Sequence, residues 1–199
     1  MADILILAGV LFAAAAGYKK GLIHAVFNLG YHVVALISSA LLYPFVTNWL
    51  KTTALNDIIY KAVEKRVAQG GIINTDSVPS VFRSIVQSGA DAAAQSTAQS
   101  VTSLAVTVIS IAIVFIAVKV ILSLLSGVMK GVSKVPVLGS VNKACGFLLG
   151  AAGGAVVVYI LLALAAAFPG TFVYNQIMAG TIAKSMFENN LVLELIFKI

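Results

Sequence analysis

The fold is decided by residues 134–168, which read KVPVLGSVNKACGFLLGAAGGAVVVYILLALAAAF. From Gly146 onward this stretch contains no charged residue and no histidine. As a helix rising 1.5 Å per residue, that part is about 35 Å long, enough to cross the ~30 Å hydrocarbon core of a bilayer. A soluble domain of this size has no place for a helix that is apolar on every side. The stretch therefore predicts a membrane span.

Glycines recur at every fourth position along this predicted span. Gly146, Gly150 and Gly154 keep one flank of the helix smooth, which allows a neighbouring backbone to approach closely. Gly139 lies just upstream, in a tight loop bounded by lysines at residues 134–143. We therefore predict that the span is the second half of a transmembrane hairpin and that other helices pack against its glycine face.

The composition places the whole chain in the membrane class. Of its 199 residues, 60% are hydrophobic and 10% are charged, with a mean hydropathy of +1.04, whereas a globular domain is about 25% charged. The net charge of +6 needs no nucleic acid, because Lys and Arg gather at the cytoplasmic ends of spans. No phosphate-binding, hydrolase or metal-site motif occurs, and the lone Cys145 cannot form an internal disulfide. We predict a non-enzymatic protein without metal or cofactor, whose first partner is the lipid bilayer.

Three further apolar segments complete an all-α arrangement of four transmembrane helices in two hairpins. The first span covers residues 1–18, and Asp3 before its core with lysines after it is the reverse of a signal peptide. The second span covers residues 21–42 and is predicted to stop before Pro44. The third covers residues 101–129. The predicted organisation is a first hairpin (1–50), a polar segment (51–100), a second hairpin (101–168) and a C-terminal segment (169–199).

Two segments outside the spans have apolar residues at helical spacing. The polar segment predicts one amphipathic helix over residues 55–69 and a second one capped by Asp76 or Ser77, with Val78 and Phe82 on its apolar face. The C-terminal segment, which carries four charged residues, predicts an interfacial helix. We expect the polar segment to be a surface for protein partners, with a solvated linker as the alternative.

Basic residues orient the predicted spans. Lys19 and Lys20 lie in the first hairpin turn, and Lys130, Lys134 and Lys143 lie between the third and fourth spans without any acidic residue. The positive-inside rule therefore places both hairpin loops in the cytoplasm. Both termini and the polar segment are then extracytoplasmic.

Four polar residues lie at membrane depth in the predicted spans. His24, Asn28 and His32 are four residues apart, so they share one face of the second span. Such groups normally face the helix bundle, where they either bond to other helices or form a path for protons or ions. Lys119 in the third span would cost roughly 2.5–3.5 kcal/mol on a lipid face. It either snorkels toward the cytoplasm or pairs with the second span or a partner protein.

Two stretches resemble the colicin V production protein (CvpA) family. The first is Asp3 before a short apolar helix, followed by GYKKG at residues 17–21, which is similar to the family's glycine-basic-glycine junction between its first two spans. The second is VPVLGSVNK at residues 135–143, followed by the glycine-lined last span. The long polar segment is similar to the longer variant of the family found in Gram-positive bacteria.

The resemblance implies a bacterial inner-membrane protein associated with toxin production and cell-envelope integrity, with no established catalytic residues. It implies action through membrane or envelope protein partners in colicin V-like toxin production or secretion and in envelope maintenance. The alternative is a small homo-oligomeric channel or transporter component. Its polar path would run along His24, Asn28, His32 and Lys119.

Overall fold

The computed structural model describes residues 1–68, 78–83, 94–128 and 139–198. Within these ranges the chain is helical and has no strand, so the all-α prediction is confirmed for this part of the chain. The elements are α1 (Ala2–Lys51), α2 (Ala54–Ala68), the 3₁₀ helix η2 (Ser80–Phe82), α4 (Ala94–Val128), α5 (Gly139–Ala166), α6 (Phe172–Met178), α7 (Thr181–Glu188) and α8 (Leu191–Lys198).

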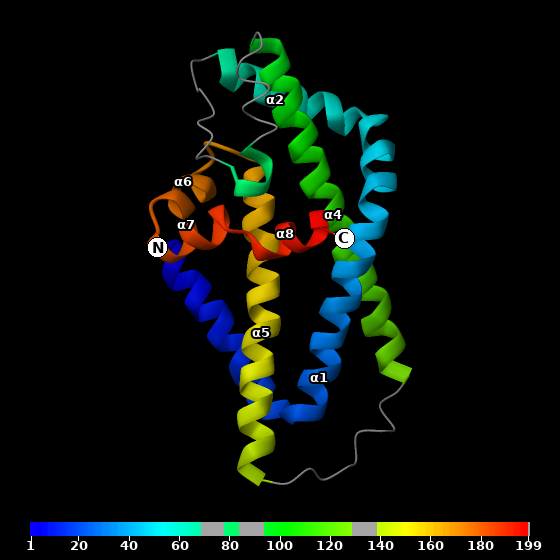
Figure 1. Cartoon of the computed structure of the whole chain (residues 1–199), viewed down its shortest axis with the longest axis vertical. Coiled ribbons are helices and arrows are strands. Elements are labelled where there is room, and N and C mark those ends of the chain that lie inside the picture. Colours follow the sequence, from blue (N-terminus) through cyan, green and yellow to red (C-terminus); the bar gives the residue numbers. More distant parts are fainter. Residues whose placement is uncertain (69–77, 84–93, 129–138, 199) are drawn as a thin grey trace.

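A sharp bend at Gly21 divides α1 into two limbs. Gly21 has φ 79° and ψ 176°, a conformation that glycine adopts easily because it has no Cβ. The first limb (residues 2–20) and the second limb (residues 22–51) descend and then rise again in the view of Figure 1. The turn predicted over residues 17–21 is therefore compressed into a single residue, with helix on both sides.

The prediction that the second span stops before Pro44 is wrong, because α1 continues to Lys51. Proline removes one backbone hydrogen bond and crowds the preceding turn. Residues on both sides of it are nevertheless packed: Tyr43 lies against the core that contains Leu36, and Leu50 is buried beside α4. Tertiary packing thus outweighs the local preference to end the helix.

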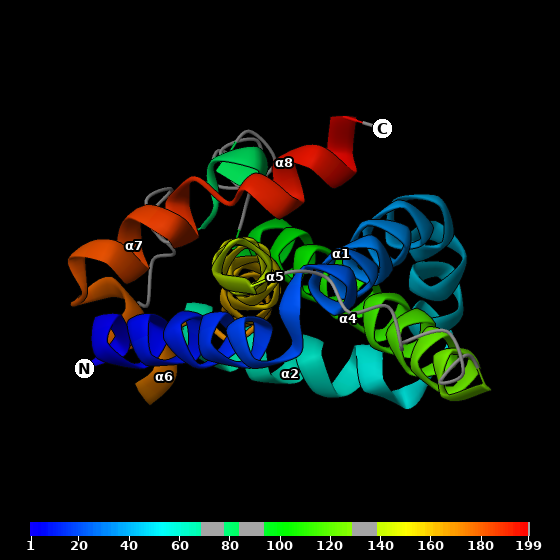
Figure 2. The same cartoon turned by 90° about the horizontal axis from the view of Figure 1, so that it is seen from below.

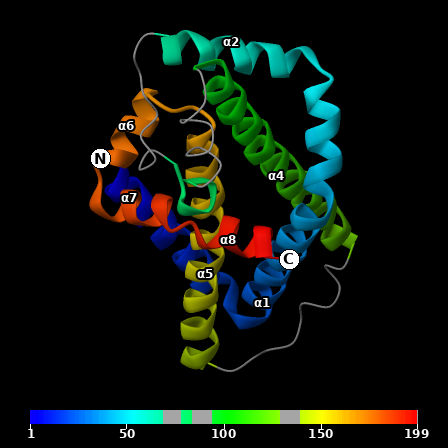
Figure 3. The same ribbon diagram turned by 45° about the horizontal axis from the view of Figure 1, so that its top comes forward.

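The long helices pack around α1. Helix α5 lies between the first limb and α8 (Figure 2), and α2 lies across the ends of the second limb and α4 (Figure 3). Among the described residues, three helices are long and apolar enough to cross a membrane: α1, Ala98–Leu125 within α4, and Ser140–Ala166 within α5. In the most apolar 18-residue stretch of each helix, the buried share is only 28% in α1, 33% in α4 and 33% in α5. Most of this apolar surface is therefore left for lipid.

The predicted apolar face that carries Phe82 is buried in the core. Phe82 is 2% exposed and belongs to the core formed by the second limb, α4, α5 and α8. Its ring meets that of Phe197 edge-on, with centroids 5.3 Å apart. The region therefore supplies core residues, and it cannot offer Phe82 to a partner.

Helix α2 lies within one residue of the predicted amphipathic helix over 55–69. Its buried residues Ile59 and Val63 pack in the cluster that contains Val101 and Ala105 of α4. Residues 69–77 and 84–93 of the polar segment, including the predicted cap at Asp76 or Ser77, lie outside the described residues.

The C-terminal segment forms three short helices in place of the one predicted helix. The breaks fall at Gly180 and Asn190. Phe187 and Leu193 are fully buried, so the inner faces of α7 and α8 are part of the core. The Asn190 side chain donates to the carbonyl of Tyr159 (3.0 Å) and accepts from the Leu193 N–H (3.1 Å), which fixes the start of α8 on α5.

Candidate functional site

The predicted glycine positions meet where α5 crosses the first limb of α1. A Cβ added to Gly150 would lie 2.5 Å from the Ala13 carbonyl oxygen, and one on Gly146 would lie 2.5 Å from the Gly17 carbonyl oxygen. A Cβ on Gly17 would in turn collide with the Gly146 carbonyl. Real side chains never approach the backbone this closely. The two helices can therefore lie at this short distance only because glycine occupies these positions.

The same crossing continues at both ends of the glycine series. A Cβ on Gly154 would lie 2.6 Å from the Ala13 Cβ. Gly139, the most N-terminal glycine of the series, is the first residue of α5. The Lys143 ammonium lies 5.8 Å from the centre of the Tyr18 ring, a cation–π contact between the two stretches that resemble the family. Lys130 and Lys134 lie outside the described residues.

Asn142 closes the bend at Gly21. Its side-chain oxygen accepts a hydrogen bond of 2.6 Å from the Leu22 N–H, the first donor of the second limb. A Cβ added to Gly21 would lie 2.7 Å from the Asn142 side-chain nitrogen. Asn142, which belongs to α5, therefore caps the second limb of α1. This bond holds the start of α5 against the bend of α1.

The predicted polar face of the second limb is exposed near the bend and buried farther along the helix. His24 and Asn28 are exposed, while His32 is 2% exposed. The His32 Nδ1–H donates to the Asn28 carbonyl oxygen at 2.6 Å. The other ring nitrogen, Nε2, is 2.8 Å from the Lys119 ammonium and accepts from it. This pair of bonds requires a neutral imidazole with its proton on Nδ1.

Lys119 pairs with the second limb, one of the alternatives that its sequence position left open. Its ammonium also lies 5.8 Å from the centre of the Phe115 ring, and the His32 and Phe115 rings are 6.1 Å apart. Among the described residues no carboxylate forms a salt bridge with Lys119. The site thus holds a cation whose protein ligand is neutral.

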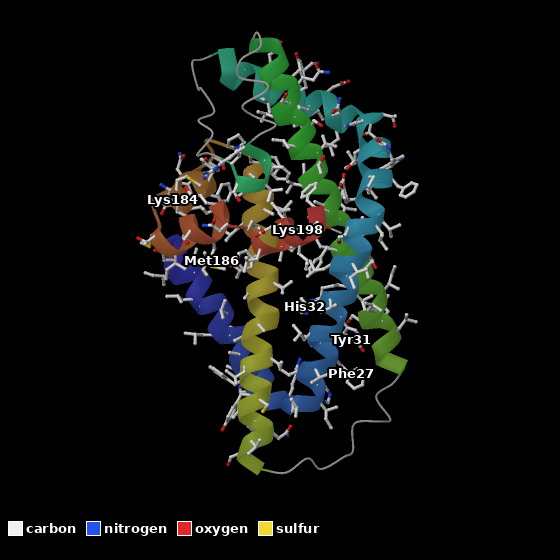
Figure 4. The ribbon with its side chains drawn as sticks, in the orientation of Figure 1. Phe27, Tyr31, His32, Lys184, Met186 and Lys198 are labelled. Atoms are coloured by element: carbon white, nitrogen blue, oxygen red, sulfur yellow. The ribbon has the colours of Figure 1, made fainter. Side chains whose placement is uncertain are left out.

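A cavity of about 750 Å³ lies beside this pair, between the two limbs of α1, α4 and α5. Figure 4 shows Phe27, Tyr31 and His32 on the second limb, with His32 directed toward α5. There a Cβ on Gly153 would lie 3.5 Å from the His32 ring. The polar wall of the cavity is formed by Lys20, His24, Asn28, Tyr31, His32, Lys119 and Ser123.

Beyond His32 this face of the second limb is buried. The next residues on that face of the second limb are Ala35, Leu36 and Ser39, and all three are buried. Ser39 donates to the carbonyl of Ala35 (2.7 Å), within its own helix. Leu36 packs with Ile111 in the apolar core of the second limb and α4. Within one copy of the described chain, the cavity therefore stops at the His32–Lys119 pair.

Asp3 is a positioning residue that the sequence did not reveal. Its carboxylate accepts from the N–H groups of Thr181 (3.0 Å) and Ala183 (2.8 Å), so it caps α7 from the first turn of α1. The partners are 178 and 180 residues away along the chain. No local pattern marks such a contact, although the position of Asp3 before the apolar helix distinguished the first span from a signal peptide.

The described groups at the site are mainly hydrogen-bond donors. No group of three or more His, Cys, Asp and Glu residues in the described ranges could hold a metal ion. The cavity brings together an ammonium, an imidazole and an amide, and its wall contains no acid and no activated nucleophile. Such donors suit an anion.

The fold and the site define an α-helical membrane protein, built from apolar helices long enough to span a bilayer around a glycine-packed crossing. The chain belongs to the colicin V production protein family, which matches residues 78–192. The match includes the stretch at residues 135–154 and leaves GYKKG at residues 17–21 outside. No curated protein and no solved structure matches the sequence.

Proposed function

We propose that this protein acts without catalysis in the bacterial cytoplasmic membrane, through protein partners, in colicin V-like toxin production or secretion and in envelope maintenance. The family match over residues 78–192 carries the proposal. The tightly packed crossing of α1 and α5 supports it, because a rigid scaffold suits a protein that holds others in place.

The experiment is photocrosslinking in the native membrane, guided by exposure. Ile58 on α2 is 63% exposed and Phe172 on α6 is 78% exposed, whereas Phe82 is buried and serves as the control position. We expect a photoreactive residue at Ile58 or Phe172 to capture one distinct envelope or secretion protein, with no capture from Phe82. Adducts of the protein with itself alone would contradict the proposal.

The proposed topology has four spans in two hairpins, with both hairpin loops in the cytoplasm. The Asn142–Leu22 bond brings the bend of α1 and the start of α5 to one end of the molecule. Lys19, Lys20 and Lys143 lie at that end, which supports a cytoplasmic location for it. The polar segment and both termini would then be extracytoplasmic.

Single cysteines test this topology in a Cys145→Ser background. A membrane-impermeant maleimide added to intact spheroplasts should label Lys61→Cys on α2 and spare Lys19→Cys, and lysis should make both reactive. Labelling of Lys19→Cys before lysis would reverse the orientation.

The second candidate function is a homo-oligomeric channel or transporter component. The cavity beside Lys119 favours it, but the column of polar residues stops at His32, so a continuous path would have to run between copies. A His24→Ala/His32→Ala double variant separates the two functions. Full complementation of a deletion strain by this variant would exclude conduction along these residues, and loss of complementation with normal membrane levels would favour it.

A further inference from the structure

We propose that the cavity binds an anionic amphiphile, with the acidic head group at Lys119 and the acyl tail leaving between the two limbs of α1. This goes beyond the proposed partner function, because it assigns a ligand class to a site of this chain. The ligand is a carboxylate or phosphate attached to a hydrocarbon chain.

The charge of the cavity wall favours an anion. Lys20 and Lys119 are cationic, and between them lie His24 and Asn28, both able to donate hydrogen bonds. None of the residues that line the cavity is Asp or Glu. A cation at membrane depth is costly unless an opposite charge accompanies it. The described chain supplies none to Lys119, so a bound anion would complete the site.

The Lys119 ammonium has donors to offer. It carries three N–H groups, and within the described residues one hydrogen bond, to His32 Nε2, uses it. His32 is itself held by the Asn28 carbonyl, so the ammonium has a fixed position at the closed end of the cavity. Head-group oxygens beside it would accept charge-assisted hydrogen bonds, which are stronger than neutral ones. His32 acts here as a positioning residue.

The open side of the cavity suits a hydrocarbon chain. Phe12 on the first limb and Phe27 on the second limb both line the cavity and are 77% and 54% exposed. Both rings are therefore largely on surfaces left for lipid. A tail passing between them would remain in an apolar environment while its head group reached the polar wall.

The size and the closed end of the cavity suit a ligand that is held. About 750 Å³ falls within the ~300–1,000 Å³ typical of small-molecule sites. Ala35 and Leu36 block the column beyond His32, so the head group would stop beside Lys119. A free inorganic anion would satisfy the charge but would leave the apolar walls exposed.

Binding of decyl phosphate tests the inference. The full-length protein is placed in phosphatidylcholine nanodiscs and titrated calorimetrically, with empty nanodiscs as the blank for partitioning. Decanol is the neutral probe, and inorganic phosphate is the competitor without a tail. The key variant is Lys119→Met, with Lys119→Arg as the charge-preserving variant. The matched control is Lys184→Met, which removes an exposed lysine on α7 that pairs with Glu188.

We expect saturable binding of decyl phosphate that weakens at least about tenfold in Lys119→Met, because charge-assisted hydrogen bonds are lost. Lys119→Arg and Lys184→Met should retain binding, and decanol should bind more weakly than decyl phosphate. Ala16→Phe, which fills the cavity from the first limb while leaving Lys119 intact, should also abolish binding.

Three results would overturn the inference. Unchanged binding in Lys119→Met, or equal binding of decanol, would remove the head-group site. Displacement by inorganic phosphate at the concentration of the probe would indicate a site for a free anion. No binding to the folded wild-type protein would leave an acidic residue of a partner helix as the occupant.

Discussion

Gly150 and Gly153 lie three residues apart on α5, but a side chain added at each would meet very different surroundings. At Gly150 the new Cβ would lie 2.5 Å from a backbone oxygen of the first limb. At Gly153 it would lie 3.5 Å from the His32 ring, an ordinary contact at the edge of the cavity. The crossing of α1 and α5 therefore needs glycine for close approach, whereas the cavity wall uses it to leave space. Glycines on the same membrane helix can therefore have different structural roles.

The largest expected effect is at the crossing. Gly150→Leu should destabilise the protein by about 3 kcal/mol or more, because the helices must separate to admit the side chain. Unfolding in a non-ionic detergent, followed by circular dichroism, measures the change. The matched control is Gly30→Leu on the second limb, where nothing lies within 4 Å of an added Cβ. Equal stability of the two variants would mean that the crossing is not held by close contact.

An intermediate effect is expected at Asn142, which joins the start of α5 to the bend of α1. Asn142→Ala removes the bond to the Leu22 N–H and should lower the free energy of unfolding by about 1 kcal/mol, as for other helix caps. The same unfolding assay detects it. The control is Asn189→Ala, which removes an exposed bond of 3.3 Å to the Ser185 carbonyl. A loss in Asn142→Ala no greater than in this control would show that the cap contributes nothing.

The smallest effect is expected at the cavity wall. Gly153→Ala should be neutral or stabilising by up to about 1 kcal/mol, because alanine is the better helix former and has room here. Gly150→Ala, measured alongside, should be destabilising. If both variants lose stability equally, the difference between the two regions disappears.

The sequence carried enough information for the helices of the membrane and for the glycine crossing. A run such as residues 146–168, apolar on every side, can be satisfied only by lipid and by other apolar helices. The spacing of Gly146, Gly150 and Gly154 marks one flank for close packing, and that flank faces the first limb in the structure. Both features are local, so a single sequence displays them.

The remaining features depend on contacts between distant parts of the chain. Lys119 and His32 are 87 residues apart, and helical periodicity places each on a face without saying which faces meet. Pro44 was misjudged for the same reason, since local preference gave a helix end where tertiary packing gives a continuous helix. The spacing around Phe82 indicated an apolar face without showing that this face packs in the core. Hydrophobic spacing also indicated the apolar residues of α7 and α8 without revealing that their inner faces are buried.

The bond between Asp3 and α7 also bears on the order in which the molecule is made. Asp3 is synthesised 178 residues before Thr181, so the N–H groups that bind its carboxylate do not exist during most of translation. The N-terminal helix can enter the membrane early, but its first turn gains its final contacts only when α7 has emerged from the ribosome. Contacts of such long sequence separation form late and slowly. A chain that ends before residue 181 would therefore contain every residue of the three long helices but neither of the N–H groups that bind Asp3.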